Sequence, residues 1–482
     1  MSKVAVIGLD GATWRIIDPL IDKGKLPFFK KLKEEGVWGE LETTTPPVTA
    51  SAWPSFMTGK KPESHGIYGF ELIDGEEIDY INGSYIQDER FWEVASNQGK
   101  KCCIANVPVT YPLQEINGLM VSGMTTPSES NSFTYPEDLK YELLDDYDYE
   151  IEARGLYSLN DEDFLDEIYR VYEKRKKVLN DLKDREEWDL FVSVIRITDI
   201  LTHFYSEPDQ EEVEELFKDL DAYLGEMVEE LTEEGYQVLL MSDHGMVMSE
   251  YSFNINKWLE DQGHLAMKKD RNFLERTGIT KSNLSDLANK LGLRDFVKRF
   301  VPENVQEAVP DGRGGMAHKL KDGKIDIEET DFFSTGMGAA LIFDFTDNPD
   351  KLQKLKKELA ELEGPDGNKV FDSFEFKQDE DYRGRGPALT GRLNREFVIG
   401  DADKGYFGEP PNAYHSYTGI LGAIGEGISE GVRRDAEIID IAPTVLHLME
   451  IDIPDYMEGE IIREVQKEQK KPSYDLTGDL DI

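Results

Sequence analysis

Cysteine is nearly absent from this chain, which has two in 482 residues, and these two, Cys102 and Cys103, are adjacent. Adjacent cysteines cannot staple a fold with an ordinary disulfide, and we expect both to be buried apolar side chains in a reducing compartment. Long apolar runs are absent as well, since no stretch approaches the ~18 uninterrupted apolar residues of a membrane span. The first residues lead directly into a strand pattern without a signal-peptide core. We therefore expect a cytoplasmic protein with no membrane contact.

Basic residues are also few. The chain has 54 lysines and arginines against 98 acidic residues, a formal net charge of −44. Such a surface repels phosphate backbones, which argues against a protein that coats nucleic acid. Acidity of this size suits solubility in a salty cytosol, where the field is screened within ~10 Å. No feature of the sequence indicates the oligomeric state.

Histidine is scarce too, with seven in the chain, so an acid or histidine at a strand end is informative. The first such residue is Asp10. The run Val4–Gly8 is apolar and rich in β-branched side chains, which predicts a buried strand ending near an acid. Ligands of open α/β sheets bind at the carboxyl ends of strands, where this carboxylate would lie. The alternative role of Asp10 is the N-cap of a helix that starts near Thr13.

Thr49 follows a rigid Pro46-Pro47 entry and is expected at a helix start. Unpaired backbone N–H groups and the positive end of the helix dipole favour an alkoxide or a bound phosphate there. Pro54 predicts that this helix is short or kinked. A threonine at such a place is more often only an N-cap, and Ser51 is a rival hydroxyl in the same loop.

A second strand-like run, Asp189–Ile195, leads into Asp199 and, four residues later, His203. This spacing puts both side chains on one face of a helix, as metal ligands from a single helix require. The segment is therefore a candidate source of two metal ligands.

A third run, Tyr236–Ser242, ends at Asp243 and His244, which can serve one metal ion or two. Gly245 then lets the backbone turn away. His415 stands just ahead of a further apolar run. Seven residues thus have the chemical types of one two-metal phosphate-cleaving site, namely Asp10, Thr49, Asp199, His203, Asp243, His244 and His415.

The order of these motifs resembles the alkaline phosphatase superfamily, and within it the type I phosphodiesterase and nucleotide pyrophosphatase family. The resemblance covers nearly the whole chain. Its motifs are Asp10, Thr49, Thr58-Gly59, His65-Gly66-Ile67, Asp199 with His203, Asp243-His244-Gly245, His415, and the ending Asp440–Leu446 with Pro454 and Met457-Glu458-Gly459. Each motif alone is weak, whereas their shared order and spacing are specific.

This resemblance implies two divalent ions, for which the mixed nitrogen and oxygen ligands favour zinc, with manganese and iron as alternatives. One ion would be held by Asp199, His203 and His415, and the other by Asp10, Asp243 and His244. Thr49 would bridge to the second ion as the nucleophile, because coordination makes an alkoxide available at neutral pH. The reaction would then pass through a covalent phospho-enzyme intermediate.

The implied activity is hydrolysis of phosphoric esters, by a phosphodiesterase or nucleotide pyrophosphatase acting on a small phosphorylated substrate such as a nucleotide or phosphodiester. Two departures from the family pattern concern the substrate. Phe70 stands where nucleotide pyrophosphatases usually have an Asn that donates to a phosphate oxygen, and Ala50-Ser51-Ala52 replaces the usual Phe-Pro-Asn after the nucleophile. The alternatives are a phosphomonoesterase or a phosphoglycerate mutase-like phosphomutase on the same scaffold. A non-catalytic binding protein is less favoured, and the loop lacks the Cys-x-Pro-x-Arg element of sulfatases.

The remaining histidines are expected to be structural. His65 would fix the Thr49 loop, whereas His264, His318 and His447 lack nearby acids in a ligand-like pattern. Four cations are left out of the predicted site because charged loop residues usually face solvent: Arg313, Lys319, Arg383 and Arg385.

The alternation of strand and helix patterns, together with the resemblance, predicts an α/β fold with a large central, mostly parallel β-sheet flanked by helices on both faces. Residues 1–245 and 411–462 would form the catalytic domain. Residues 246–410 would form an inserted, cap-like region that contributes to substrate choice, and residues 463–482 a flexible acidic and polar tail.

Three further elements are predicted away from the motifs. Asp161–Glu187 is amphipathic and rich in charge, which predicts a helix with one solvated face. Lys351–Glu361 is also expected to be helical, and Ala339–Phe343 to be a strand.

Overall fold

The computed structural model describes residues 2–465, except for residues 75–76, 154–155, 157–158, 269–319, 321–323, 337, 347, 377–385, 401–404 and 411–412. His318, the four cations named above and the predicted tail beyond residue 465 lie outside the described residues. The chain divides into two compact units. The first comprises Met1–Ile67, Ile81–Met248 and Asn412–Ile482, and the second comprises Tyr68–Tyr80 and Ser249–Pro411. Among the described helices, none has the length and apolar content needed to cross a membrane.

One large sheet forms the centre of the first unit. Its strands are, in order, β20 (Val432–Arg433), β2 (Val37–Glu42), β19 (Thr418–Ile424), β9 (Tyr236–Met241), β1 (Lys3–Leu9), β8 (Leu190–Ile195), β5 (Cys102–Val107), β6 (Gly118–Ser122) and β7 (Thr134–Tyr135), with β21 (Ala436–Glu437) beside β2. The central strands β9, β1, β8, β5 and β6 are parallel to one another. Every residue of β8 and β5 is buried, as a strand covered on both faces requires. The predicted mostly parallel sheet is confirmed.

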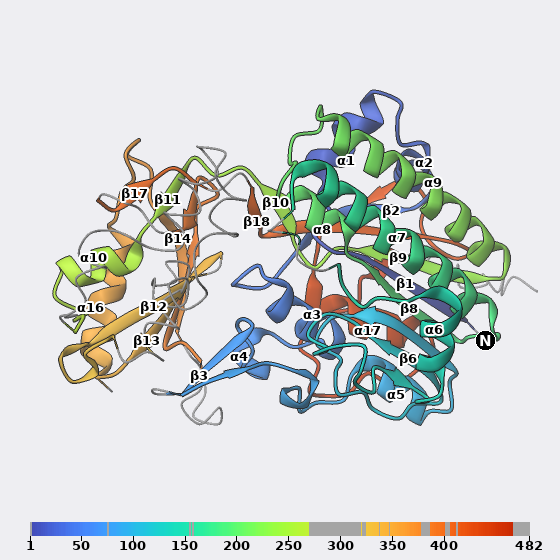
Figure 1. The fold of residues 1–482 in the computed structure, drawn as a ribbon, viewed down its shortest axis with the longest axis horizontal. Coiled ribbons are helices and arrows are strands. Elements are labelled where there is room, and N and C mark those ends of the chain that lie inside the picture. Colours follow the sequence, from blue (N-terminus) through green and yellow to red (C-terminus); the bar gives the residue numbers. More distant parts are fainter. Residues whose placement is uncertain are drawn as a thin grey trace, which may run out of the picture. The chain divides into compact units, whose positions relative to one another are not determined.

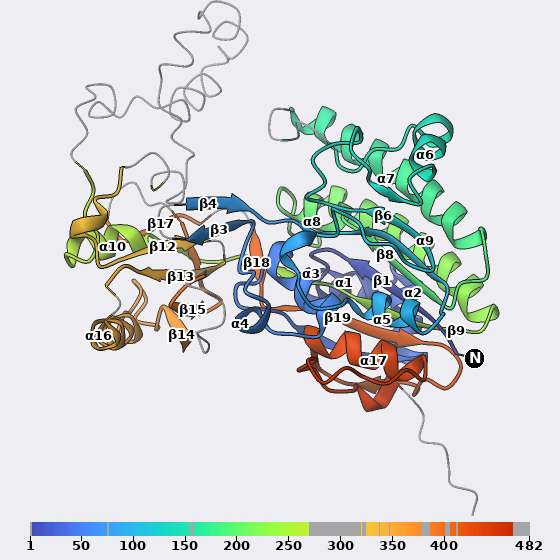
Figure 2. The same ribbon diagram turned by 90° about the horizontal axis from the view of Figure 1, so that it is seen from below.

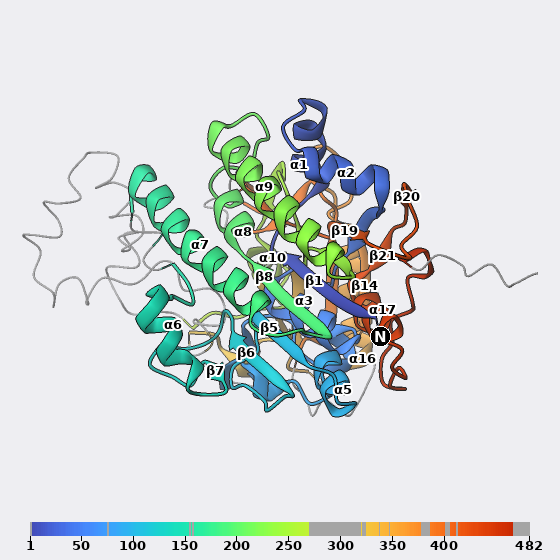
Figure 3. The same ribbon diagram turned by 90° about the vertical axis from the view of Figure 1, so that its right-hand side faces the viewer.

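Helices cover both faces of this sheet (Figures 1 and 3). On one face lie α1 (Trp14–Asp22), α2 (Pro27–Glu35), α7 (Asp161–Asp184) and α9 (Glu211–Glu233), and on the other α3 (Thr49–Thr58), α5 (Phe91–Asn97) and α17 (Ile441–Leu448). Strand alternation explains the division. Ile7 packs into the core formed with the first group of helices, whereas a Cβ on neighbouring Gly8 would lie 2.5 Å from Trp53 of α3. The predicted helices on both faces are also confirmed.

Shorter elements complete the first unit. They are α4 (Pro62–His65), η1 (Gly83–Tyr85), α6 (Leu139–Tyr147), α8 (Ile197–Thr202), β10 (Gly245–Val247), β18 (Tyr414–Ser416), η5 (Ile438–Asp440) and η6 (Arg463–Val465). The two cysteines lie in β5 and are fully buried, as expected.

The register of the parallel strands brings three carboxyl ends to one edge of the sheet. Leu9 of β1 is level with Ile195 of β8, and Gly8 is level with Met241 of β9. The residues that follow these strands therefore emerge side by side. The candidate acids all follow one of the three strands.

The second unit has its own core and smaller sheets. Four strands form an antiparallel sheet whose order is visible in Figure 2: β12 (Phe332–Gly336), β13 (Ala339–Asp344), β15 (Leu389–Leu393) and β14 (Phe371–Phe376). The other elements are the hairpin of β3 (Glu71–Asp74) and β4 (Glu77–Tyr80), the sheet of β16 (Phe397–Ile399), β11 (Tyr251–Phe253) and β17 (Phe407–Gly408), and the helices α10 (Ile255–Asp261), η3 (Ile327–Glu329) and α16 (Pro349–Ala360). Helices α7 and α16 and strand β13 confirm the three further predicted elements.

Candidate active site

Three buried carboxylates converge at the carboxyl edge of the sheet. Asp10 directly follows β1, Asp199 lies in α8 after β8, and Asp243 comes just after β9. Asp10 and Asp243 are fully buried, and Asp199 is 5% exposed. The alternative role of Asp10 as a helix cap is wrong, because Thr13 caps α1 and its side chain accepts the N–H of Arg15.

Gly11 allows these acids to approach one another. Its φ of 71° lies in the left-handed region, and a Cβ at this position would lie 2.9 Å from Cα of Asp199. The N–H of Gly11 donates to Oδ1 of Asp243 at 3.2 Å. Gly11, in the turn after β1, therefore contacts both Asp243, which follows β9, and Asp199 of α8.

Thr49 is the first residue of α3, and the N-cap is Val48. The N-cap alternative for Thr49 is therefore wrong, and its hydroxyl is free for another role. Oγ1 lies 3.3 Å from Nε2 of His244. The rival hydroxyl of Ser51 is fully buried and has no hydrogen-bond partner among the described residues.

A first group of possible metal ligands is formed by Asp199, His203 and His415. Oδ1 of Asp199 lies 3.3 Å from Nε2 of His203 and 3.5 Å from Nε2 of His415. The two imidazole nitrogens are 3.1 Å apart. The predicted i to i+4 spacing holds, with His203 as the C-cap residue of α8.

Strand pairing brings His415 to this place. Strand β10 starts directly after His244 and pairs antiparallel with β18, so that Met246 is opposite His415. Gly245 has no room for a side chain, since a Cβ there would lie 2.1 Å from the carbonyl oxygen of Thr418. The rings of His244 and His415 stack with their centroids 3.7 Å apart.

A second group surrounds Nε2 of His244. This nitrogen lies 3.3 Å from Oδ2 of Asp243 and 3.6 Å from Oδ1 of Asp10. Donor atoms of Asp10, Asp199 and His244 all lie within 4.8 Å of one another. Asp199 thus lies between the two groups, whereas the sequence assigned it to one.

Backbone acceptors orient two of the histidines. Nδ1 of His415 lies 2.9 Å from the carbonyl oxygen of Pro47, and Nδ1 of His244 lies 3.2 Å from that of Gly245. A carbonyl can only accept, so each Nδ1 carries a proton, and in a neutral ring Nε2 then has the lone pair. An outer hydrogen bond of this kind is the usual support of a metal-binding histidine.

Within the described part of the chain, one oxygen of each carboxylate has no hydrogen-bond donor. These atoms are Oδ1 of Asp10, Oδ1 of Asp199 and Oδ2 of Asp243, all of them buried. An unpaired buried carboxylate oxygen costs free energy unless a cation or proton compensates it. Three such oxygens among three imidazoles form a donor set that fits divalent metal ions.

Burial and crowding perturb the pKa values of the acids. Burial raises the pKa of Asp10 to about 6, against the lowering effect of Arg196, and it also raises the pKa of Asp243 well above its usual value. Burial alone would raise the pKa of Asp199, but His203 and His415 hold it well below its usual range. Burial and mutual repulsion therefore disfavour three ionised carboxylates side by side unless cations compensate them.

The histidine shifts follow the same causes. Burial lowers the pKa of His244 well below its usual value, so that the imidazole is neutral. Burial alone would lower the pKa of His203 as well, but Asp199 raises it.

Arg196 and Glu152 belong to the site, although the sequence analysis assigned them no role. Arg196 is 7% exposed; its Nε lies 2.9 Å from Oδ2 of Asp10, and its Nη2 lies 3.5 Å from Oδ2 of Asp199. Nη1 donates to Oε2 of Glu152 at 2.7 Å. A cation directly after a buried strand, three residues before Asp199, was the available signal for Arg196. Glu152 lies in the segment between α6 and α7 and offered none.

Comparison with known proteins shows the family and the fold of the chain. The model of the type I phosphodiesterase / nucleotide pyrophosphatase family matches residues 4–326. The chain belongs to this family. It is accordingly an enzyme of the phosphodiesterase and nucleotide pyrophosphatase type, a hydrolase of phosphoric esters. His415 lies beyond the matched residues, and no curated protein sequence matches the chain.

Solved structures share the fold of this family member. Murine ectonucleotide pyrophosphatase / phosphodiesterase 5 is 13% identical, with a TM-score of 0.53 and coverage of 94% of this chain and 96% of its own. Phosphonoacetate hydrolase from Sinorhizobium meliloti 1021 is also 13% identical, with a TM-score of 0.55 and coverage of 93% and 96%. At this identity the likeness shows an alkaline phosphatase-like fold.

Two other histidines of this phosphodiesterase-family protein have clear partners. His65 is 2% exposed; its Nδ1 accepts the N–H of Ile67 at 3.1 Å, and its Nε2 lies 2.9 Å from Oγ of Ser55 in α3. It joins the loop at Ile67 to α3, the helix that starts at Thr49, which agrees with its predicted structural role. His264, which lacks a ligand-like pattern of acids in the sequence, lies 3.2 Å from Glu358 and 3.8 Å from Asp331 in the second unit. Those acids are distant in sequence and are brought near by folding.

We expect His65 to make stability sensitive to acid. Burial, and then Lys60, lower its pKa to about 3 from 6.5. A lowered folded-state pKa contributes stability above pH 6.5 that is lost as the pH falls toward 3, at about 1.4 kcal/mol per pH unit. The free energy of unfolding should therefore fall between pH 6.5 and 5, and His65→Gln should lose this part of the slope. Equal slopes in chemical denaturation of both proteins would contradict it.

Proposed function

We propose that this protein hydrolyses small phosphodiesters, including nucleotide derivatives, with two divalent ions, zinc being favoured, and with Thr49 as the nucleophile. One observation carries the proposal: three carboxylate oxygens without a hydrogen-bond donor among the described residues gather with the Nε2 atoms of three histidines, one of which lies beside Oγ1 of Thr49. Phosphoryl transfer needs cations at such a place because charge develops on several oxygens at once.

The ligand sets that we propose follow the two groups of donor atoms. One ion would be held by Asp199, His203 and His415, and the other by Asp10, Asp243 and His244 beside Thr49. When bound, divalent ions would lower the pKa of a coordinated hydroxyl and draw negative charge from phosphate oxygens. Three carboxylates outweigh the single guanidinium of Arg196, so the residues alone would repel a phosphate and two divalent ions would reverse the sign.

The start of α3 supports Thr49 in this role. The first intrahelical bond is donated by the N–H of Ser51 to the carbonyl of Val48 at 2.9 Å, so the N–H groups of Thr49 and Ala50 precede it. These groups and the helix dipole favour an anionic oxygen at the hydroxyl. Phe70 stands where the family usually has an Asn that donates to a phosphate oxygen. The backbone N–H groups at the start of α3 would donate to such an oxygen in its place.

His244 is better suited to binding a cation than to acting as the base for Thr49. Its low pKa makes the imidazole a weak proton acceptor. Because Nδ1 donates its proton to the carbonyl oxygen of Gly245, the lone pair on Nε2 remains available to a metal ion.

The test is hydrolysis of bis(p-nitrophenyl) phosphate beside p-nitrophenyl phosphate, with protein stripped of metal and reloaded with zinc or manganese. We expect no turnover of the stripped protein, and after reloading a kcat/KM for the diester at least about tenfold above that for the monoester, a difference of about 1.4 kcal/mol in transition-state binding. Preference for the monoester would favour the phosphatase or mutase alternative, which the replacement of Asn by Phe70 supports. Full turnover without metal would contradict the proposal.

A further inference from the structure

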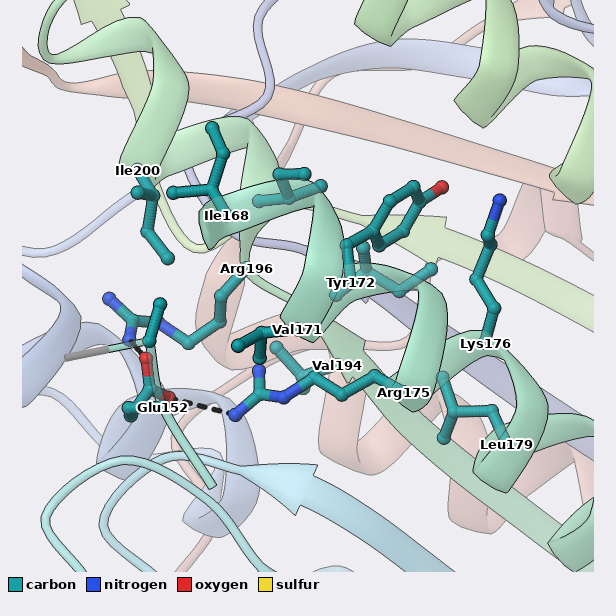
Figure 4. A pocket seen from close by; sticks show the side chains of 13 residues that line it. Glu152, Ile168, Val171, Tyr172, Arg175, Lys176, Leu179, Val194, Arg196 and Ile200 are labelled. Carbon is teal, nitrogen blue, oxygen red and sulfur yellow. Dashed lines mark hydrogen bonds and ion pairs between the residues drawn. The ribbon is translucent and has the colours of Figure 1, made fainter. Parts of the chain in front are cut away.

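The guanidinium of Arg196 has a carboxylate on three sides. Figure 4 shows Glu152 between Arg196 and Arg175, with dashed lines to both. Oε2 of Glu152 accepts from Nη1 of Arg196 at 2.7 Å, and Oε1 accepts from Nη2 of Arg175 at 3.1 Å. The other two neighbours are Asp10 and Asp199. Arg196 thus joins the candidate metal centre to helix α7, which carries Arg175.

Arg196 contacts the same oxygen, Oδ2, of both Asp10 and Asp199. It faces Oδ2 of Asp10 at 2.9 Å and Oδ2 of Asp199 at 3.5 Å. The Oδ1 atoms of the two residues face the histidines, and neither accepts a hydrogen bond from any residue that the structure describes. In Asp243 the N–H of Gly11 has the corresponding role, because it donates to Oδ1, whereas Oδ2 has no donor among the described residues.

This division concerns both halves of the centre. Asp10 and Asp199 follow different strands and belong to different proposed ligand sets, but one planar guanidinium spans them. A fork of fixed geometry holds two carboxylates at a set separation, which a point charge cannot do.

The surroundings hold Arg196 in place. Arg196 and Arg175 are 7% and 8% exposed, and Val171 and Val194 lie beside them in the close-up (Figure 4). These residues line a cavity of about 20 Å³, room for about one water molecule. Among largely buried side chains ionic hydrogen bonds are strong, and an unpaired partner is costly.

We propose that Arg196 is a positioning residue that selects the oxygen that Asp10 and Asp199 each present to the metal ions, and that Glu152 holds Arg196 in that position. The inference rests on the proposed two-metal function. It predicts that metal affinity depends on residues that do not bind metal.

The experiment is a titration of metal-stripped protein with zinc in competition with a chromophoric chelator at fixed pH, which gives the number of ions bound and both affinities without any substrate. We expect about 10–100-fold weaker binding of both ions in Arg196→Met, since partners of metal ligands have effects of this size. Arg196→Lys keeps the charge but not the fork, so at least one binding step should stay weakened. Glu152→Gln should weaken both steps by about tenfold, because it loosens Arg196 while the aspartates are intact.

Arg90→Met is the matched control. Arg90 is 4% exposed and pairs with Glu93 in the first unit, without a contact to the cluster among those described. This variant loses a buried arginine and should bind both ions as the wild type does, even if its melting temperature falls. Circular dichroism and melting curves confirm that each variant is folded.

Three outcomes would overturn the inference and can be told apart. If the wild type binds two ions and Arg196→Met binds them equally or more tightly, the guanidinium only opposes the cations, and the metal centre stands without its positioning role. If the wild type binds no divalent ion, the proposed function fails together with the inference. Loss of affinity in Arg90→Met equal to that in Arg196→Met would also overturn it, because general destabilisation would then suffice.

Discussion

Replacing Thr49 by alanine is expected to abolish turnover while leaving both metal ions bound. The substitution removes the hydroxyl that lies 3.3 Å from Nε2 of His244 and leaves the six proposed Asp and His ligands intact. Removal of a nucleophile lowers kcat by several orders of magnitude, on the order of 10³-fold or more. Stability should change little, because Val48 is the N-cap of α3 and the hydroxyl has no capping role. Steady-state rates and metal content of the same preparation test both parts.

Thr49→Ser and Ser51→Ala are the controls for this prediction. A serine at position 49 keeps a hydroxyl on the same backbone, so measurable turnover should return. Ser51 is buried without a hydrogen-bond partner among the described residues, and its loss should leave kcat within a few-fold of the wild type. Turnover retained in Thr49→Ala but lost in Ser51→Ala would transfer the nucleophile to Ser51. Turnover retained in both would point to direct attack by water.

The acids of the site were predictable because they follow buried strands. The runs that became β1, β8 and β9 are apolar, and in a parallel sheet covered on both faces such runs end at one edge. Asp10, Asp199 and Asp243 could therefore be placed together from the sequence. Their division between two ions rests on the family resemblance and stays a prediction, since Asp199 lies near both groups of donor atoms.

His415 shows the limit of local patterns. Its position depends on the pairing of β10 with β18, two three-residue strands separated by most of the second unit. Strands this short carry too few residues for a period to show. The resemblance to a family supplied His415, and the backbone pairing explains it.

Arg196 and Glu152 were missed for a related reason. A charged residue in a loop or after a strand usually faces solvent, so the sequence alone gives no reason to place either side chain in the site. Only folding shows that α7 covers Arg196 and that Glu152 is its counter-ion. The hairpin of β3 and β4 could not be assigned to its unit from local patterns either, because its residues belong to the second unit although they come early in the chain.

Replacing His415 by alanine is expected to remove about one metal ion per chain and to lower kcat by on the order of 10²-fold or more. Nε2 of His415 is one of three donor atoms in its group, at 3.1 Å from that of His203 and 3.5 Å from Oδ1 of Asp199. Loss of one ligand of three leaves too few to hold an ion tightly, whereas Asp10, Asp243 and His244 are unchanged. The strand itself should persist, because β18 pairs with β10 through its backbone. Elemental analysis after dialysis gives the number of ions.

His264→Ala is the matched control for His415→Ala, because it deletes an imidazole that also contacts acids but lies in the second unit. It should keep both ions and most of the activity. One ion lost in His415→Ala and none in His264→Ala would place His415 in the metal centre. An unchanged metal count in His415→Ala would remove it from that centre, and Asp199 with His203 would then need a third ligand from elsewhere. Loss of both ions would mean that the two halves bind together, as a shared Asp199 between the two groups would require.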